Sequence, residues 1–174
     1  SKKKLRFAGN REKVENIIEE TPVTFDAISN VMQVIHGDFN YGNLIFSKDT
    51  SEPVVLDFED TLYSWLPPVV DIALAVERFS FVRVEDEERV ANLALSLIKE
   101  YEEQTMRKII NRHGILKEAL RILSARALCL LSEQSFRGKR LPDSEWDKFI
   151  YLYEQTSCRS RVFDKIESAL ISGN

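Results

Sequence analysis

The stretch that decides the fold is HGDFNYGN, at residues 36–43, followed by VVLDFE at residues 54–59. Asp38 and Asn43 lie five positions apart in a segment rich in turn-forming residues. A second aspartate, Asp57, comes 14 residues after Asn43, at the end of an apolar, β-branched run. Carboxylate and amide oxygens are the ligands that Mg²⁺ prefers in proteins. The spacing therefore predicts a loop and a strand end that together orient a hydroxyl and hold a cation on phosphates.

The order of these residues is that of kinase catalytic loops, in which an aspartate is followed, after four residues, by an asparagine and then by a metal-binding Asp-Phe pair. In this pattern Asp38 orients the acceptor hydroxyl and accepts its proton late in transfer, while Asn43 and Asp57 bind Mg²⁺. Gly37 stands where protein kinases carry arginine, and Glu59 stands where they carry glycine. The pattern predicts a phosphotransferase without the regulatory switches of protein kinases.

Three motifs in this order resemble the aminoglycoside phosphotransferase and choline kinase-like superfamily of small-molecule kinases. They are His-Gly-Asp at 36–38 with its asparagine, Asp-Phe at 57–58, and Asp-Ile-Ala at 71–73. The resemblance covers residues 36 to 73, and the rest of the chain is expected to form the helical carboxy-terminal lobe of that family.

The resemblance implies ATP and Mg²⁺ as cofactors and a small-molecule hydroxyl as acceptor, on an amino alcohol, an amino sugar or an aminoglycoside-like compound. It also implies that His36, Gly37 and Asp71 support the catalytic loop structurally. A homoserine or sugar kinase of the same superfamily is an alternative. A further alternative is a non-catalytic kinase-like module that binds a nucleotide or a partner, although the intact acid and amide residues argue against it.

Substrate contacts are expected from acidic and aromatic residues close to the motifs. Glu59, Asp60 and Glu77 supply carboxylates, and Tyr41 and Trp65 supply aromatic faces. Carboxylates beside aromatic rings suit an amine or a quaternary ammonium group. The same residues are equally compatible with a solvated acidic edge next to core aromatics.

Composition favours a single globular domain in the cytoplasm. Of the 174 residues, 44% are hydrophobic and 30% are charged, which is typical of a chain that folds around a core. The net charge of −4 argues against nucleic-acid binding, and no apolar run is long enough to span a membrane. The two cysteines, Cys129 and Cys158, lack metal-site spacing and suggest a reducing compartment.

The chain reaches its catalytic loop by residue 36 and does not begin with methionine. A complete kinase of this type also needs an amino-terminal lobe, with a strand-borne lysine, its glutamate partner and a loop over the phosphates. We therefore expect residues 1–174 to be one domain, the carboxy-terminal lobe of a longer protein. Alone it is expected to be poorly active and to self-associate through the apolar surface on which the other lobe docks.

Periodicity predicts an α+β chain that is mostly α, with a small β-hairpin at one edge. The resemblance implies that this chain is a protein kinase-like carboxy-terminal lobe whose hairpin carries the catalytic and metal residues. The hairpin is expected from residues 43–47 and 54–58, after an extended approach at 33–35. Helices are expected at 10–20, 26–32, 69–79, 84–112, 115–136, 144–156 and 160–171.

Overall fold

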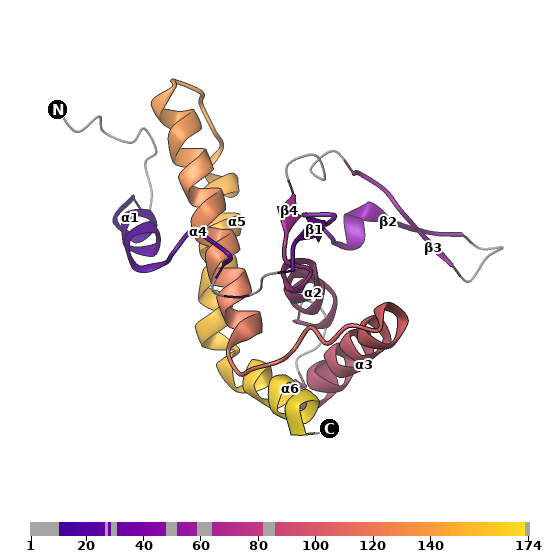
Figure 1. The fold of residues 1–174 in the computed structure, drawn as a ribbon. Coiled ribbons are helices and arrows are strands. Elements are labelled where there is room, and N and C mark those ends of the chain that lie inside the picture. Colours follow the sequence, from indigo (N-terminus) through magenta and orange to yellow (C-terminus); the bar gives the residue numbers. More distant parts are fainter. Residues whose placement is uncertain are drawn as a thin grey trace.

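The computed structural model describes residues 11–26, 28, 31–47, 52–58, 64–81 and 86–172. The described chain is mostly helical, with two small antiparallel strand pairs along one side (Figure 1). None of the helices within these ranges is both long and apolar enough to cross a membrane. The helices are α1 (Arg11–Glu20), the 3-10 helix η1 (Tyr41–Asn43), α2 (Val69–Ala75), the π-helix η3 (Val76–Phe81), α3 (Glu87–Thr105), α4 (Ile115–Phe136), α5 (Asp143–Cys158) and α6 (Ser160–Ser172).

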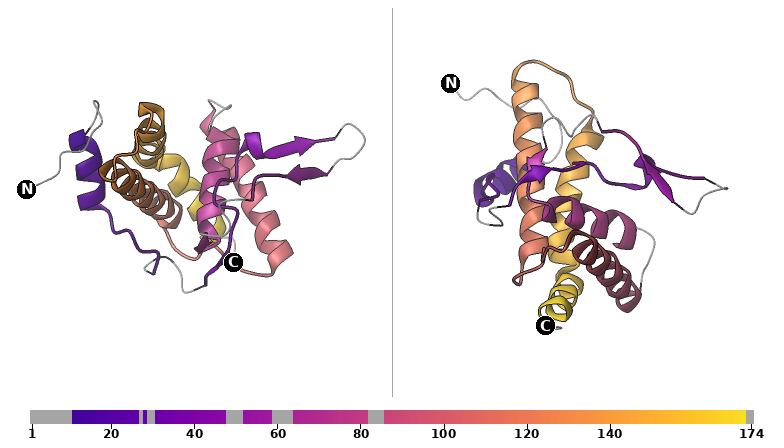
Figure 2. Two further views of the ribbon diagram at one scale, coloured as in Figure 1. Left: turned by 90° about the horizontal axis from the view of Figure 1, so that it is seen from above. Right: turned by 45° about the vertical axis from the view of Figure 1, so that its right-hand side comes forward.

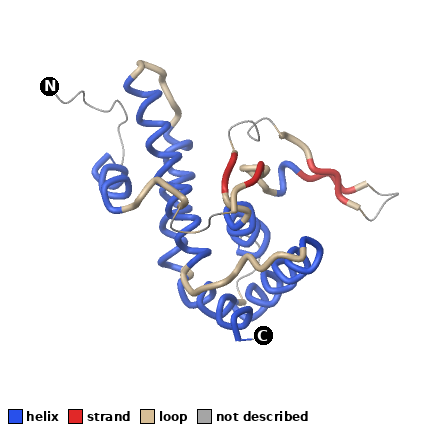
Figure 3. The backbone as a smooth tube through the Cα atoms, viewed as in Figure 1, coloured by secondary structure: helices blue, strands red, loops and turns tan. Residues whose placement is uncertain are grey.

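The predicted hairpin is present as strands β2 (Leu44–Phe46) and β3 (Pro53–Val55). It projects from the helical body in the tube view (Figure 3). Leu44 pairs with Val55, and the Leu56 N–H donates a 2.8 Å hydrogen bond to the Asn43 carbonyl, which extends the ladder by one step. Because the strands are antiparallel, the start of β2 and the end of β3 lie at the same end of the hairpin. This register brings the segments that carry Asn43 and Asp57 together.

A second strand pair, β1 (Gln33–Val34) with β4 (Trp65–Leu66), holds the approach to the catalytic loop. The extended approach was predicted, whereas β4 was not, because two residues are too few to show a strand pattern. The Ile35 N–H continues the pairing with a 3.0 Å hydrogen bond to the Ser64 carbonyl. Residues 67 and 68 then lead directly into α2, so the loop is fixed close to that helix.

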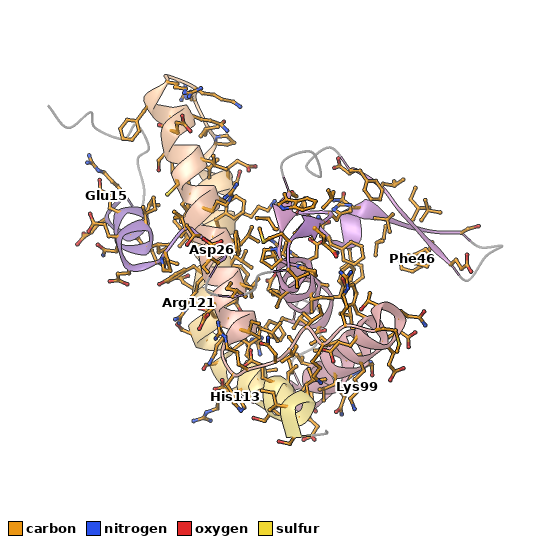
Figure 4. All side chains as sticks on the ribbon, in the orientation of Figure 1. Glu15, Asp26, Phe46, Lys99, His113 and Arg121 are labelled. Atoms are coloured by element: carbon orange, nitrogen blue, oxygen red, sulfur yellow. The ribbon has the colours of Figure 1, made fainter. Side chains whose placement is uncertain are left out.

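The core lies between the helices. Helices α4 and α5 run side by side, α2 packs on α4, and α3 packs on α6 (Figures 1 and 2). Arg121 of α4, labelled in Figure 4, donates a 2.8 Å hydrogen bond to the Thr156 hydroxyl of α5. Burial of each large aliphatic or aromatic side chain contributes about 1.5–3 kcal/mol. The largest fully buried apolar side chains include Phe163, Ile98, Ile110, Leu116, Leu120, Leu128 and Leu152.

Helix α1 packs against α4 and α5 through a smaller apolar cluster. Val14 and Ile17 are buried there against Trp146 and Ile150 of α5. The spacing of these two α1 residues puts both on one face of the helix. The segment therefore joins the helical lobe rather than standing apart from it.

The expected helix over 84–112 is wrong at its carboxyl end, because α3 ends at Thr105. Met106, the residue after the helix, has a left-handed backbone with φ 52°. This position is usually a glycine, and a methionine there gives no sign in the sequence that the helix ends. The Glu102 carboxylate accepts backbone hydrogen bonds from Ile109 at 2.7 Å and Ile110 at 2.9 Å. These bonds hold the segment after α3 in a non-helical path. The short helix expected over 26–32 is also not seen at the described residues of that range.

A buried carboxylate joins the last helix to the start of α4. Glu167 of α6 accepts hydrogen bonds from the backbone N–H groups of Gly114 at 2.5 Å and Leu116 at 2.9 Å. These donors belong to the start of a helix, where backbone N–H groups lack partners within the helix. Burial raises the pKa of Glu167, and the two hydrogen bonds oppose that shift. His113, labelled in Figure 4, immediately precedes this junction.

Candidate active site

Asp71 holds the backbone of the catalytic loop from the first turn of α2. Its Oδ2 accepts a 2.7 Å hydrogen bond from the His36 N–H, and its Oδ1 accepts one of 2.9 Å from the Gly37 N–H. Gly37 has φ 87°, a backbone conformation that is strained in residues that have a Cβ atom. Burial raises the pKa of Asp71, and the two backbone hydrogen bonds lower it in part. The loop conformation thus depends on a glycine and on one carboxylate from a distant segment.

The imidazole of His36 connects the loop to the end of β3. Its Nδ1 accepts a hydrogen bond of 3.3 Å from the Asp38 N–H, so the proton lies on Nε2. Nε2 then donates a 2.8 Å hydrogen bond to the Leu56 carbonyl. The ring is buried, and it packs edge-on against Phe39 and at a tilt against Phe58. His36 therefore ties Asp38 to the segment that carries Asp57 without exposing a ring nitrogen to a substrate.

Two asparagine side chains brace the carbonyl of Asp38. The Nδ2 atoms of Asn40 and Asn43 donate to it at 3.0 Å and 2.8 Å. A carbonyl only accepts hydrogen bonds, so the amide nitrogen of Asn43 must face it, and Oδ1 remains the free ligand atom. Asn40 also accepts a 2.7 Å hydrogen bond from the Gly42 N–H. Sequence reasoning missed Asn40, although its place two residues after Asp38 in a turn was a usable signal.

Asp57 follows β3 in a left-handed conformation, with φ 62°. Aspartate tolerates this region better than most residues, but strain of this kind is concentrated at functional sites. Its side chain is exposed, and no hydrogen bond or ion pair joins it to another residue in the described ranges. The hairpin therefore presents an unused carboxylate.

The donor set of Asn43 and Asp57 fits Mg²⁺. It offers one amide oxygen and one carboxylate, both hard oxygen ligands. Within the part of the chain that the structure describes, no three His, Cys, Asp or Glu side chains form a self-sufficient metal site. A cation with few protein ligands is the kind that is shared with substrate phosphates.

A pocket of about 240 Å³ opens beside Asp38. It lies between the predicted catalytic loop, residues 64 and 66 at β4, and helices α2, α4 and α5, with Arg78 of η3 also in its wall. The Nζ atom of Lys148, on α5, is 3.8 Å from Asp38 Oδ1. A larger pocket of about 420 Å³, near Val69 and Ile109, contains none of the motif residues. The smaller pocket is lined by Gly37, Asp38, Ser64, Leu66, Leu74, Arg78, Leu123, Arg126, Ala127, Leu130, Lys148, Phe149 and Leu152.

The aromatic residues expected to contact substrate do not line this pocket. Trp65 is 61% exposed, and strand alternation turns it away from the side on which Ser64 and Leu66 line the pocket. Tyr41 packs edge-on against Phe79, at 4.4 Å between ring centroids, and its hydroxyl donates to the Phe79 carbonyl at 3.4 Å. Neither ring lines the pocket beside Asp38.

Of the three acidic residues expected there, the structure describes only Glu77, which does not line the pocket. Glu77 lies in η3 and is fully buried, so it presents no surface to an acceptor. Neither of its carboxylate oxygens accepts a hydrogen bond, although Arg78 Nε forms an ion pair with Oε2 at 3.2 Å. Burial raises the pKa of Glu77, and the charge of Arg78 opposes the shift. Glu59 and Asp60 lie outside the described residues.

The basic side chains of the pocket were missed by sequence reasoning. Arg78, Arg126 and Lys148 come from three different helical segments, and no local spacing relates them to the loop. Only the packing of α4 and α5 beside the loop brings them together.

The match to a family model shows that this chain belongs among phosphotransferases of the kinase-like superfamily. The sequence model of the phosphotransferase enzyme family matches residues 3–109, and the chain belongs to this family. The match is consistent with the aminoglycoside phosphotransferase and choline kinase-like superfamily, and its range contains all three motifs. No match was found among curated proteins or among solved structures.

Proposed function

We propose that this chain is the catalytic lobe of a phosphotransferase that moves the γ-phosphoryl group of ATP to a small-molecule hydroxyl, with Mg²⁺ as cofactor. The observation that carries the proposal is the position of Asp38. Its backbone is fixed by His36 and Asn43, while its carboxylate faces a pocket of small-molecule size.

In this proposal each residue has a role that follows from the chemistry of its side chain. Asp38 positions the acceptor hydroxyl and takes its proton as the bond to phosphorus forms, which an ordinary carboxylate can do when proton loss comes late. Asn43 and Asp57 hold the metal. Mg²⁺ supplies charge neutralisation on the phosphate oxygens when bound. Positioning and electrostatics account for most of the catalysis in phosphoryl transfer.

We propose that the remaining ATP contacts come from an amino-terminal lobe of the same protein, docked over the hairpin. Ile45 and Phe46 are adjacent and point to opposite faces of the strand, yet both are exposed, at 52% and 64%. Figure 4 shows Phe46 on the projecting hairpin. Exposed apolar side chains of this size usually mark an interaction surface. The same surface supports the expectation that the isolated chain self-associates.

The test measures Mg²⁺-dependent phosphate transfer from ATP by the natural full-length protein that contains this chain. The acceptor panel holds amino alcohols, amino sugars, aminoglycosides and hydroxy acids. Asp38→Asn is expected to lower transfer by about 10²–10⁴-fold, the usual contribution of a positioned acid–base group, while nucleotide binding persists. Asp26→Asn, at an exposed aspartate outside the site, is the matched control.

Transfer that survives Asp38→Asn contradicts the proposal. Nucleotide binding without transfer to any member of the panel favours a non-catalytic kinase-like module instead.

A further inference from the structure

Among the residues that the structure describes, those that line the pocket beside Asp38 carry more positive than negative charge. Three cations, Arg78, Arg126 and Lys148, and one carboxylate, Asp38, stand among its described lining residues. The chain as a whole has a net charge of −4, so this local excess of cations is not a property of the average surface. A concave site with one sign of charge concentrates ligands of the opposite sign.

None of these cations makes a hydrogen bond to a residue that the structure describes, although two of them form ion pairs. Arg126 makes no hydrogen bond or ion pair with any residue in the described ranges. Lys148 lies 3.8 Å from Asp38 Oδ1, which is beyond hydrogen-bond distance. Arg78 is ion-paired with the buried Glu77, at 3.2 Å between Nε and Oε2, but does not donate a hydrogen bond to it. Guanidinium and ammonium donors that make no hydrogen bond to the protein can bind the carboxylate or phosphate of a ligand.

The rest of the wall limits the size and polarity of a ligand. Its volume of about 240 Å³ is below the range of roughly 300–1,000 Å³ that encloses drug-sized molecules. Most of the other lining side chains are apolar, and they suit a short carbon skeleton rather than a polyamine or an oligosaccharide. They are Leu66, Leu74, Leu123, Leu130, Phe149 and Leu152.

We propose that the acceptor is a small hydroxy compound that carries an anionic group, a carboxylate or a phosphate. Its hydroxyl lies on Asp38, and its anionic group is bound by Arg126, Arg78 and Lys148. This inference rests on the proposed function, because it identifies the acceptor of the same site. It differs from the expectation of an amine or quaternary ammonium, for which the one acidic residue that the structure describes, Glu77, is buried away from the pocket.

The test uses acceptors that differ mainly in charge: glycerol, glycerate, glycerol phosphate and, as a cation, choline. The natural full-length protein is expected to phosphorylate an anionic member with a kcat/KM at least about tenfold above that of glycerol, because a charge-assisted hydrogen bond contributes this much. Comparison of glycerate with glycerol phosphate distinguishes the two anions.

Variants assign the preference to the pocket. Arg126→Gln and Lys148→Gln are each expected to raise the KM of the anionic acceptor about tenfold or more, with the KM of ATP unchanged. Arg126→Lys keeps the charge but not the planar donor pair, and should give an intermediate effect. Arg137→Gln is the matched control, because Arg137 caps the same helix with a side chain 77% exposed outside the pocket.

The outcomes separate this inference from the proposed function. Binding of the same four compounds without ATP is measured by calorimetry. Anion-selective binding that Arg126→Gln abolishes, without any transfer, supports the pocket and contradicts the phosphotransferase. Transfer to glycerol or choline as efficient as to the anions supports the phosphotransferase and overturns the inference. A rise in the KM of ATP alone, or no binding of any anion, also overturns it.

Discussion

The Oδ2 atom of Asp71 accepts a 2.7 Å hydrogen bond from the backbone N–H of His36, although 35 positions separate the two residues. The other carboxylate oxygen accepts from Gly37, so both oxygens of Asp71 are used by consecutive amides. The first turn of α2 thereby sets the path of the loop that presents Asp38. The loop and the first turn of α2 therefore form one structural unit, because Asp71 joins them.

Replacing Asp71 with asparagine should disturb this unit. One of the two amides then faces an NH₂ group instead of an oxygen, because an amide side chain has a single acceptor atom. The expected loss of stability is about 1–3 kcal/mol, as for a buried donor left unsatisfied. Urea unfolding measures this loss, and hydrogen exchange should become faster at the amides of His36 and Gly37. Slow exchange at both amides in the variant contradicts this account.

The buried Glu77 predicts a dependence of stability on pH. Its pKa is raised above the ordinary value of 4.5 by burial, so the folded state holds the proton more tightly than the unfolded state. Stability from this residue is complete below pH 4.5 and is lost as pH rises through the raised pKa. Glu77→Gln cannot ionise and should gain stability over the natural protein as pH rises from 4.5 to 8.

Denaturant unfolding at several pH values measures this difference, with Glu145→Gln as an exposed control in α5. A difference between the Glu77 variant and the natural protein that stays constant with pH counts against a raised pKa.

The left-handed backbone of Asp57 predicts that two variants without the carboxylate differ in stability but not in activity. A glycine adopts φ 62° freely, whereas alanine pays for the clash of its Cβ. Asp57→Gly should therefore be more stable than Asp57→Ala by about 1 kcal/mol, since the entropy cost of glycine offsets part of the relief. Both variants lack the carboxylate, and both should lose Mg²⁺-dependent transfer in the full-length protein. Equal unfolding free energies for the two variants argue against backbone strain at this residue.

The exposed hairpin predicts self-association of the isolated chain. Replacing both Ile45 and Phe46 with threonine removes apolar area and keeps a residue that favours strands. Light scattering over a range of concentrations should show a smaller mean mass for the double variant than for the natural chain. Leu93→Thr, at an exposed leucine of α3, is the control. A natural chain that stays monomeric at all concentrations disproves the expectation.

Local patterns predicted the elements whose signals are local. Helix α4 was expected at 115–136, the range it occupies, because glycines flank a long apolar periodic segment. The hairpin strands were also predicted, from β-branched runs on either side of a polar turn. The end of α3 was not, because the Glu102 carboxylate that holds the following segment acts through backbone amides and leaves no mark in periodicity.

The sequence by itself determined the chemical class of this protein. The acid, the amide and the second acid lie within 20 residues, and their order alone indicates phosphoryl transfer. Only the tertiary structure decided the character of the pocket beside Asp38. Arg126 and Lys148 lie far along the chain from Asp38 and reach it because α4 and α5 pack beside the loop. Such contacts arise from packing between distant segments, so they cannot be predicted from the spacing of residues that are close in the sequence.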